Sequence, residues 1–337
     1  MMAIKPDTPP LAVTMGDPAG CGPQITARAW NTLRRESRRT PFYVIADPAL
    51  FACETQVIQD PAETGTYFDD ALPVLPLSGR LPVVQPGTAD SAAAASILES
   101  IERATRHALE GYSAGVVTNP ISKAVLYSAG FRHPGHTEYL AAICEDVTGE
   151  PNPPVMMLAG GGLRVSLVTI HVPLMSIPQH LTPDTLASVA HTTNLALKRD
   201  FGISQPRLAF TGLNPHAGES GSIGTEERDI INPLATQLRE AGMDISDARS
   251  ADTVFAEMLD GRFDAVIAMT HDQGLIPVKT LDFWGGVNTT LGLPIIRTSP
   301  DHGTAYDAAR EGTARPDSLI SAIRLASEMA GNRLSHV

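Results

Sequence analysis

Short apolar runs alternate with amphipathic segments along most of this chain. Apolar runs of about four to eight residues are typical of buried strands, and apolar positions three and four apart are typical of helices. Strands are predicted at 11–15, 43–46, 116–118, 155–159, 163–170, 207–211, 264–269 and 293–297. Helices are predicted at 23–33, 90–110, 120–130, 182–198 and 316–329, and shorter ones after 133, 225, 253 and 304. This alternation predicts an α/β fold with a mainly parallel sheet.

The length of 337 residues allows two modest domains. We expect a two-lobed α/β/α architecture, with 1–130 and 285–337 in the first lobe and 131–284 in the second. The segment 60–90 is rich in Pro, Gly and Asp and predicts an irregular connection. Three consecutive glycines at 160–162 separate two apolar runs and predict a hairpin.

Three of the predicted strands lead directly to histidines. The nearly unbroken apolar run 264–269 is typical of a strand buried on both faces, and His271 follows it. His171 ends another run, and His216 lies in the loop after a third. Ligands in open α/β sheets bind beyond the carboxyl ends of strands, and three neutral imidazoles can hold a divalent metal. The spacing leaves a second interpretation open, in which each is a solvated loop histidine.

Several other segments have the composition of anion sites. The glycine-rich turn 16–23 lacks the endings of a P-loop and of a dinucleotide fingerprint, so we interpret it as a structural turn. Lys123 is predicted in the first turn of a helix, an unfavourable place for a cation, so it either contacts an anion or is a solvated surface lysine. His136 and Thr137 are predicted at a helix N-terminus, where backbone amides can bind phosphate.

Bulk composition excludes some classes of protein. A formal net charge of −12 argues against nucleic-acid binding, which needs a basic surface. Three widely spaced cysteines form no disulfide framework and fit a reducing, cytoplasmic location. The first ten residues have no hydrophobic signal core, and the longest apolar region contains Arg164, His171 and Pro173, so no membrane span is expected.

Six motifs together resemble the 4-hydroxythreonine-4-phosphate dehydrogenase family of vitamin B6 (pyridoxine, pyridoxal phosphate) biosynthesis. The resemblance runs from about 11 to 310, which is nearly the whole chain. The motifs are Thr14-Met-Gly-Asp-Pro-Ala-Gly, Gly135-His-Thr-Glu, Leu213-Asn-Pro-His-Ala-Gly-Glu, His271-Asp-Gln-Gly-Leu-Ile-Pro-Val-Lys, Val287-Asn-Thr-Thr-Leu-Gly-Leu-Pro and Arg297-Thr-Ser-Pro-Asp-His-Gly-Thr.

The resemblance implies an isocitrate/isopropylmalate-dehydrogenase-like fold and a homodimer with its active site in a cleft at the dimer interface. It implies NAD-dependent oxidation, with NADP as an alternative cofactor, and decarboxylation of 4-phosphohydroxy-L-threonine to 3-amino-2-oxopropyl phosphate. One divalent metal (Zn, Mg, Co or Mn) would be held by His171, His216 and His271, one of them from the partner. The matching substrate contacts are His136, Thr137, Lys279, Asn288 and Arg297.

Within this resemblance, further roles are expected from residue chemistry. Asp252, Asp272 and Lys279 are catalytic candidates, because a carboxylate can orient a ligand histidine or move a proton and an ammonium group can contact an anionic substrate. Asp272 has a second interpretation, as the cap of its own turn. Contacts with NAD are expected in 288–304, and the candidates are Asn288, Leu291, Gly292 and Asp301.

Three positions depart from the family pattern and could reshape the pocket, namely Asn119, Ser122 and Thr270. The same chemistry on D-threonate or D-erythronate 4-phosphate is therefore an alternative within the class. Two alternatives lie outside it. A metal-dependent hydrolase would use the three histidines to activate water, and a phosphometabolite-binding protein would bind ligand without turnover.

Overall fold

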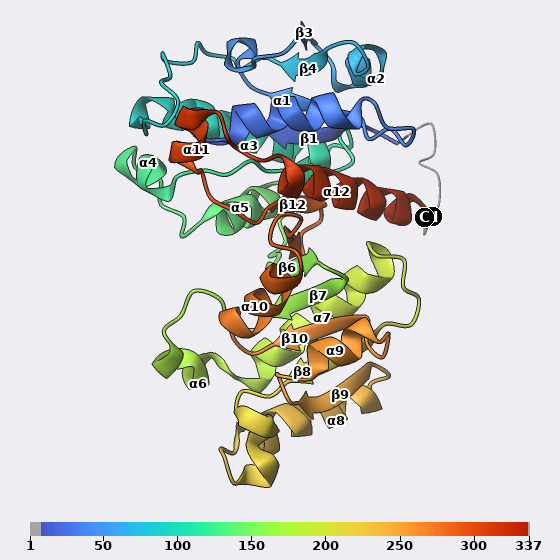
Figure 1. The fold of residues 1–337 in the computed structure, drawn as a ribbon. Helices are drawn as coiled ribbons and strands as arrows, with labels where there is room; N and C mark the ends of the chain where they lie inside the picture. Colours follow the sequence, from blue (N-terminus) through green and yellow to red (C-terminus); the bar gives the residue numbers. More distant parts are fainter. Residues whose placement is uncertain (1–7, 336–337) are drawn as a thin grey trace. The chain divides into compact units, whose positions relative to one another are not determined.

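The computed structural model describes residues 8–335. The described chain divides into two compact units, 8–154 with 293–335, called unit 1, and 155–292, called unit 2. Each unit is an α/β structure with strands in its interior and helices around them (Figure 1). The predicted α/β class with mainly parallel strands is confirmed.

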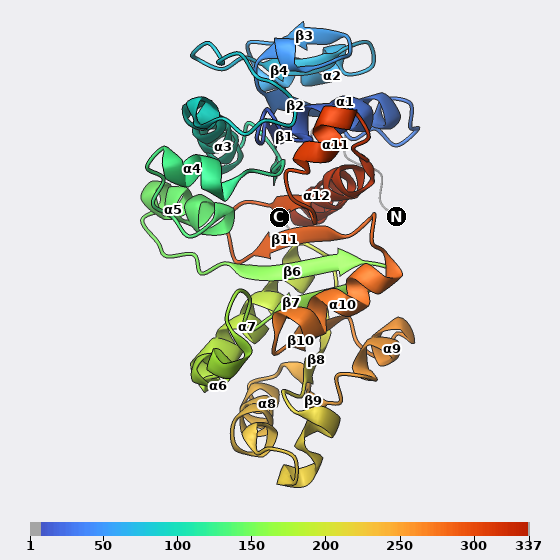
Figure 2. The same cartoon turned by 60° about the vertical axis from the view of Figure 1, so that its left-hand side comes forward.

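Unit 1 contains a fully parallel sheet in the order β3-β4-β2-β1-β5-β12. Its strands are β1 (Leu11–Thr14), β2 (Phe42–Ile45), β3 (Thr55–Val57), β4 (Leu72–Leu75), β5 (Val116–Val117) and β12 (Arg297–Pro300). Its helices are α1 (Gly22–Leu33), α2 (Thr64–Tyr67), α3 (Ala94–Leu109), α4 (Lys123–Ser128), α5 (His136–Thr148), α11 (Tyr306–Glu311) and α12 (Asp317–Ser335). Helix α12 packs on β12 and α1, whereas α3 packs on β1 and α5 (Figure 2).

Unit 2 contains a six-stranded sheet in the order β11-β6-β7-β10-β8-β9. The strands are β6 (Val155–Gly160), β7 (Leu163–Leu167), β8 (Arg207–Thr211), β9 (Asp244–Arg249), β10 (Ala265–Ala268) and β11 (Val287–Leu291). The helices are α6 (Ile177–His180), α7 (Pro183–Arg199), α8 (Asn232–Glu240), α9 (Val254–Leu259) and α10 (His271–Leu281). The predicted hairpin is confirmed, because β6 and β7 are antiparallel; β11 also runs antiparallel to β6.

The core of unit 2 follows from the alternation of side chains along its strands. On β10, Ala265 and Ile267 point into a cluster with α7 and α8, whereas Val266 and Ala268 point into a cluster with α9 and α10. All four side chains are buried, as the unbroken apolar run predicts for a central strand covered on both faces.

The unit boundaries differ from the expected lobes. Residues 131–154 belong to unit 1 rather than to the second lobe, because α5 packs against α3. Residues 285–292 belong to unit 2 rather than to the first lobe, because β11 pairs with β6 along its whole length.

Several local predictions were also wrong. The segment 60–90 was expected to be an irregular connection, but it contains β4 and α2 in addition to loops. The strand was missed because Pro73 interrupts its apolar run. The strand expected at 293–297 begins at Arg297 instead, and the preceding strand is β11. The polar edge strand β9 and the helix α10 were not predicted, the latter because it contains Pro277.

Among residues 8–335, no helix combines the length and the apolar character needed to cross a membrane. All three cysteines are free, with Cys21 and Cys144 buried and Cys53 partly exposed.

Candidate functional site

The three strands that precede the histidines are neighbours in unit 2. Strand β10 pairs in parallel with β7 on one side and with β8 on the other, so their carboxyl ends lie at the same edge of the sheet. The ends of β7 and β10 are joined further, because Val168 N donates to Ala268 O at 2.9 Å and Thr169 Oγ1 donates to Met269 O at 2.7 Å. These bonds fix the two backbones immediately before His171 and His271.

His171 and His271 lie close together at this edge. Their ring centroids are 5.7 Å apart, and the ring planes are inclined by 45°. Both line a pocket of about 260 Å³. The pocket is lined by Thr169, Ile170, His171, Val172, Leu174, Ile177, Thr270, His271 and Asp272. Two imidazoles at this separation can share one metal ion, since a metal such as zinc lies about 2 Å from each coordinating nitrogen.

Asp272 contacts its neighbour His271 directly. Its Oδ1 lies 2.8 Å from His271 Nδ1. A carboxylate at this position favours the proton on Nδ1 and leaves the Nε2 lone pair for a metal. The alternative role of Asp272 as a cap is wrong, because the Thr270 side chain accepts from Gln273 N and caps α10.

His216 follows β8 within a short left-handed turn. Residues 216–220 all have positive φ, and the value for His216 is 51°. His216 lies near enough to Asp252 to help lower the pKa of that carboxyl, although the hydrogen bond from Ser250 Oγ, 2.5 Å long, contributes most. Within the described residues, no group of three or more His, Cys, Asp or Glu side chains could hold a metal. One chain therefore brings His171 and His271 together without His216.

Gln273, which was not predicted as a site residue, links these strand ends by hydrogen bonds. Its Oε1 accepts from Met269 N at 3.1 Å and from Thr211 Oγ1 at 3.2 Å, while its Nε2 donates to Gly212 O at 2.8 Å. It also forms a capping box with Thr270. The Thr-x-x-Gln spacing after an apolar run is a sequence signature of such a helix start and could have revealed it.

Unit 1 carries a second group of expected site residues. Arg297, at the start of β12, is only 4% exposed, and its Nη2 donates to Thr118 Oγ1 at 2.8 Å. Burial lowers the pKa of Arg297 to about 10, a shift that Glu138 opposes. The Nε2 atom of His136 is buried without a hydrogen-bond partner, and burial followed by the charge of Arg297 lowers the His136 pKa well below its usual value. A buried arginine beside a neutral histidine is suited to bind an anion.

The N-terminus of α5 adds to this group. Helix α5 begins at His136, and Thr137 and Glu138 lie in its first turn. A Cβ placed on Gly135 would lie 2.7 Å from a Glu138 carboxylate oxygen and 3.3 Å from Lys123 Nζ, so both side chains converge on the residue that precedes the helix. The free backbone amides of this turn favour a negatively charged ligand.

The remaining candidates are distributed over both units. Lys279 lies in the last turn of α10, and Asn288 and Leu291 lie on β11, followed by Gly292 with a φ of 87°. These four belong to unit 2, whereas Asp301, which follows β12, belongs to unit 1. The expected NAD contacts are therefore not all on one unit.

The glycine-rich turn and the unusual positions have structural roles. A Cβ on Gly16 would lie 2.6 Å from Asn119 Cβ, and one on Gly20 would lie 2.8 Å from Thr304 O, so the turn packs against neighbouring loops. Asn119 Nδ2 donates to Thr14 O at 2.9 Å, and Ser122 caps α4. Asn119, Ser122 and Thr270 thus each stabilise local backbone.

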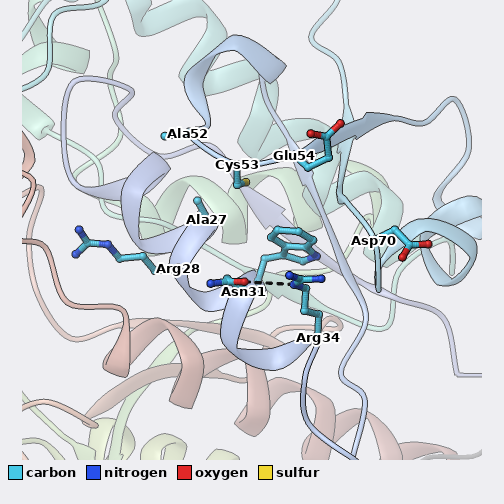
Figure 3. A pocket seen from close by; sticks show the side chains of 9 residues that line it. Ala27, Arg28, Asn31, Arg34, Ala52, Cys53, Glu54 and Asp70 are labelled. Atoms are coloured by element: carbon cyan, nitrogen blue, oxygen red, sulfur yellow. Dashed lines mark hydrogen bonds between the residues drawn. The ribbon is translucent and has the colours of Figure 1, made fainter.

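A larger pocket of about 350 Å³ lies in unit 1, away from every expected site residue. Figure 3 shows it between α1 and the segment 52–54. Arg34 Cζ lies 4.6 Å from the centroid of the Trp30 ring. Arg34 already donates to Asp69 O at 2.7 Å. The lining combines acids and arginines without a buried polar atom left for a ligand, so size alone does not make it the site.

Comparison with known proteins shows the family of the chain. A family model described as pyridoxal phosphate biosynthetic protein PdxA matches residues 37–326. The 4-hydroxythreonine-4-phosphate dehydrogenase of Maricaulis maris is 50% identical over 336 residues, covering 95% of this chain and 97% of that protein. The enzyme of the same name from Caulobacter vibrioides is 49% identical over 331 residues, covering 96% of this chain and 98% of that protein.

Solved structures give the same result. The crystal structure of 4-hydroxythreonine-4-phosphate dehydrogenase from Klebsiella pneumoniae matches with a TM-score of 0.82 and 35% sequence identity. The match covers 96% of this chain and 100% of that chain.

Proposed function

The chain belongs to the PdxA family of pyridoxal phosphate biosynthetic proteins, and from this premise we propose that it is a 4-hydroxythreonine-4-phosphate dehydrogenase. It oxidises 4-phosphohydroxy-L-threonine with a nicotinamide cofactor, and the resulting β-keto acid loses carbon dioxide to give 3-amino-2-oxopropyl phosphate. The observation that carries the proposal is the His171–His271 pair beside Asp272, in a chain 50% identical to an enzyme of that name over 336 residues.

The histidine pair suits a divalent metal. Two imidazoles 5.7 Å apart, one of them oriented by a carboxylate, are a donor set that favours zinc or cobalt over magnesium or manganese. A bound cation would polarise the substrate hydroxyl and then the ketone. His171 and His271 would hold it, and Asp272 would keep His271 in the correct orientation. His216 is the proposed third ligand.

The substrate phosphate and carboxylate need cations that stay charged. Arg297 fits, because a pKa of about 10 leaves it protonated at neutral pH despite its burial. Neutral His136 and Thr137 at the N-terminus of α5 would complete the phosphate contacts. Lys279 and Asn288, both in unit 2, are further proposed substrate contacts.

Asp252 is a candidate for moving the hydroxyl proton. Its pKa is lowered, mainly by the Ser250 hydrogen bond, so it is an ionised base at neutral pH. Asp272 is the alternative base, although its contact with His271 favours an orienting role. Lys279 is the candidate for donating a proton after carbon dioxide leaves.

NAD, or NADP, would accept the hydride. The proposed contacts are Asn288, Leu291, Gly292 and Asp301, and Gly292 with a φ of 87° allows the backbone to turn where no side chain blocks a ligand. The glycine-rich turn 16–23 is not among the proposed NAD contacts, because it packs against Asn119 and Thr304.

We also propose that the enzyme is a cytoplasmic homodimer. Apolar side chains are exposed next to the histidine pair, where Met175 is 90% exposed and Leu174 lines the pocket. Phe283 and Trp284, which follow α10, are exposed as well. A second copy that covers these residues would also supply the missing third imidazole, His216.

The test is NADH formation by the purified protein with 4-phosphohydroxy-L-threonine, D-threonate 4-phosphate and D-erythronate 4-phosphate, each with and without a chelator. We expect turnover with the amino substrate that the chelator abolishes and that added Co²⁺ or Zn²⁺ restores. Preference for a sugar-acid phosphate would retain the mechanism and change the substrate. Phosphate release without NADH would instead support the hydrolase, and binding without either product would support the binding protein.

A further inference from the structure

The turn that carries His216 has an unusual backbone. All five residues from 216 to 220 lie in the left-handed region, with φ between 42° and 74°, and only Gly218 among them is a glycine. Residues with a side chain disfavour this region because Cβ approaches the following carbonyl oxygen. Local preference therefore opposes the turn, and contacts from outside it must hold it in place.

The carboxylate of Glu227 supplies such contacts. Glu227 is 2% exposed, and within residues 8–335 no ion pair involves it. Its Oε1 accepts from Asn214 N at 2.7 Å, and its Oε2 accepts from Asn214 Nδ2 at 3.0 Å. A buried carboxylate that binds backbone two residues before His216 fixes where the turn begins.

Two glycines make room for this carboxylate. A Cβ on Gly212 would lie 3.0 Å from Glu227 Oε1, and a Cβ on Gly218 would lie 2.6 Å from Glu227 Oε2. Gly212 precedes the turn and Gly218 follows His216, so the carboxylate touches the backbone on both sides of the histidine. The Glu227 carboxylate therefore contacts residues on both sides of His216, namely Gly212, Asn214 and Gly218.

We propose that Glu227 is a positioning residue that holds the left-handed turn and so aims the His216 imidazole at the metal. The inference rests on the proposed role of His216 as a metal ligand. Glu227 itself touches neither metal nor substrate in this assignment. Its effect is on where the imidazole points, as is usual for groups that support metal ligands.

The experiment measures Co²⁺ binding by the metal-free, full-length protein, from its visible absorption bands. The variants are Glu227→Gln and His216→Ala, and Asp264→Asn is the matched control. Asp264 also binds a backbone amide, that of Arg207, at 2.8 Å, but at the opposite end of β8. Thermal unfolding of each variant reports general loss of stability.

We expect Glu227→Gln to weaken Co²⁺ binding by roughly 10- to 100-fold and to change the absorption bands. Asp264→Asn should lower the unfolding temperature but leave the affinity and the bands as in the wild type. Wild-type affinity and bands in Glu227→Gln would overturn the positioning role, provided that His216→Ala has lost binding. Equal binding by wild type and His216→Ala would instead overturn the metal assignment in the proposed function.

A gentler variant covers the case in which Glu227→Gln does not fold. Asn214→Ala removes the side-chain donor to Glu227 Oε2, at 3.0 Å, and to Glu226 Oε2, at 2.7 Å, and keeps the backbone bond to Glu227 Oε1. It should weaken Co²⁺ binding about three- to tenfold, less than Glu227→Gln does, because the backbone bond to Oε1 remains. Unchanged binding in this variant would also contradict the proposal.

Discussion

The imidazole rings of His171 and His271 lie 5.7 Å apart, at the ends of two strands that pair in parallel. Their backbones are joined just upstream by the bond from Thr169 Oγ1 to Met269 O. Within residues 8–335, His216 does not lie with them in a group of three side chains that could hold a metal. In the proposed homodimer, the pair comes from one copy and His216 from the other.

This arrangement predicts the outcome of subunit mixing. Neither His216→Ala nor the double variant His171→Ala, His271→Ala should turn over alone. After subunit exchange, the mixture should recover about a quarter of wild-type activity, because half of the dimers are mixed and each has one intact site of two. A mixture of His171→Ala with His271→Ala should stay inactive, since the pair is broken in every site. Activity in that second mixture, or none in the first, would contradict the arrangement.

Arg297→Lys should impair substrate binding strongly. The guanidinium is buried, and bonds from Nε and Nη2 to Thr118 Oγ1 fix its orientation. Lysine keeps the charge and loses the planar fork. We expect KM for the phosphorylated substrate to rise about 10- to 100-fold, as for loss of a charged hydrogen bond. The control is Arg315→Lys, an exposed arginine paired with Asp317, which should leave KM unchanged.

Periodicity predicted the strands that matter most for the site. The apolar run before His271 is a central strand, and its neighbours are the two other strands that lead to histidines. Strand order itself could not be derived, because it depends on packing between segments far apart in sequence. Strand β9 was missed because its sequence is polar, and an edge strand can pair with β8 without an apolar alternation.

The local chemistry of the site was less predictable. Thr270 departs from the family pattern, and its role as the cap of α10 was not predicted, although the Thr-x-x-Gln spacing is a signature of that role. The left-handed turn at His216 could not be foreseen, because four of its five residues disfavour that conformation. Arg297 was identified by resemblance alone, whereas its burial and its contact with Thr118 depend on the fold.

His136 should make the folded state sensitive to acid. Its pKa is lowered in the folded protein, first by burial and then by Arg297, whereas in the unfolded chain it is near 6.5. Below that pH the unfolded chain binds a proton that the folded protein does not, so stability falls as pH falls. The slope from this group is at most about 1.4 kcal/mol per pH unit.

The comparison is between wild type and His136→Gln, with urea unfolding followed from pH 8 to pH 5. The variant should lose part of the decline in stability below pH 6.5 and match the wild-type slope above it. Identical slopes throughout would mean that His136 is protonated in the folded state as readily as in the unfolded chain.

The three thiols should differ in reactivity. Burial raises the pKa of both Cys21 and Cys144 to about 11, so only about one in a thousand of each is thiolate at pH 8. The pKa of Cys53 is raised as well, by burial and then by Glu54, but this residue is partly exposed. A thiol reagent at pH 8 should therefore label one cysteine per native chain, and Cys53→Ser should abolish that labelling. Rapid labelling of Cys21 or Cys144 would show that the native state opens.

Gly274→Ala should displace the helix that carries His271. A Cβ on Gly274 would clash with Leu167 and lie 3.1 Å from Val165 Cγ1, both on β7. Alanine favours helices, but here the contact dominates, and overpacking of this kind costs about 1–3 kcal/mol. Gly331→Ala is the matched control, because Gly331 lies in α12 with no atom within 4 Å of its added Cβ. That variant should be neutral or slightly stabilised in thermal unfolding. Because α10 also carries Lys279, Gly274→Ala should lose kcat and Co²⁺ affinity together, whereas loss of stability alone would show that β7 yields and α10 keeps its place.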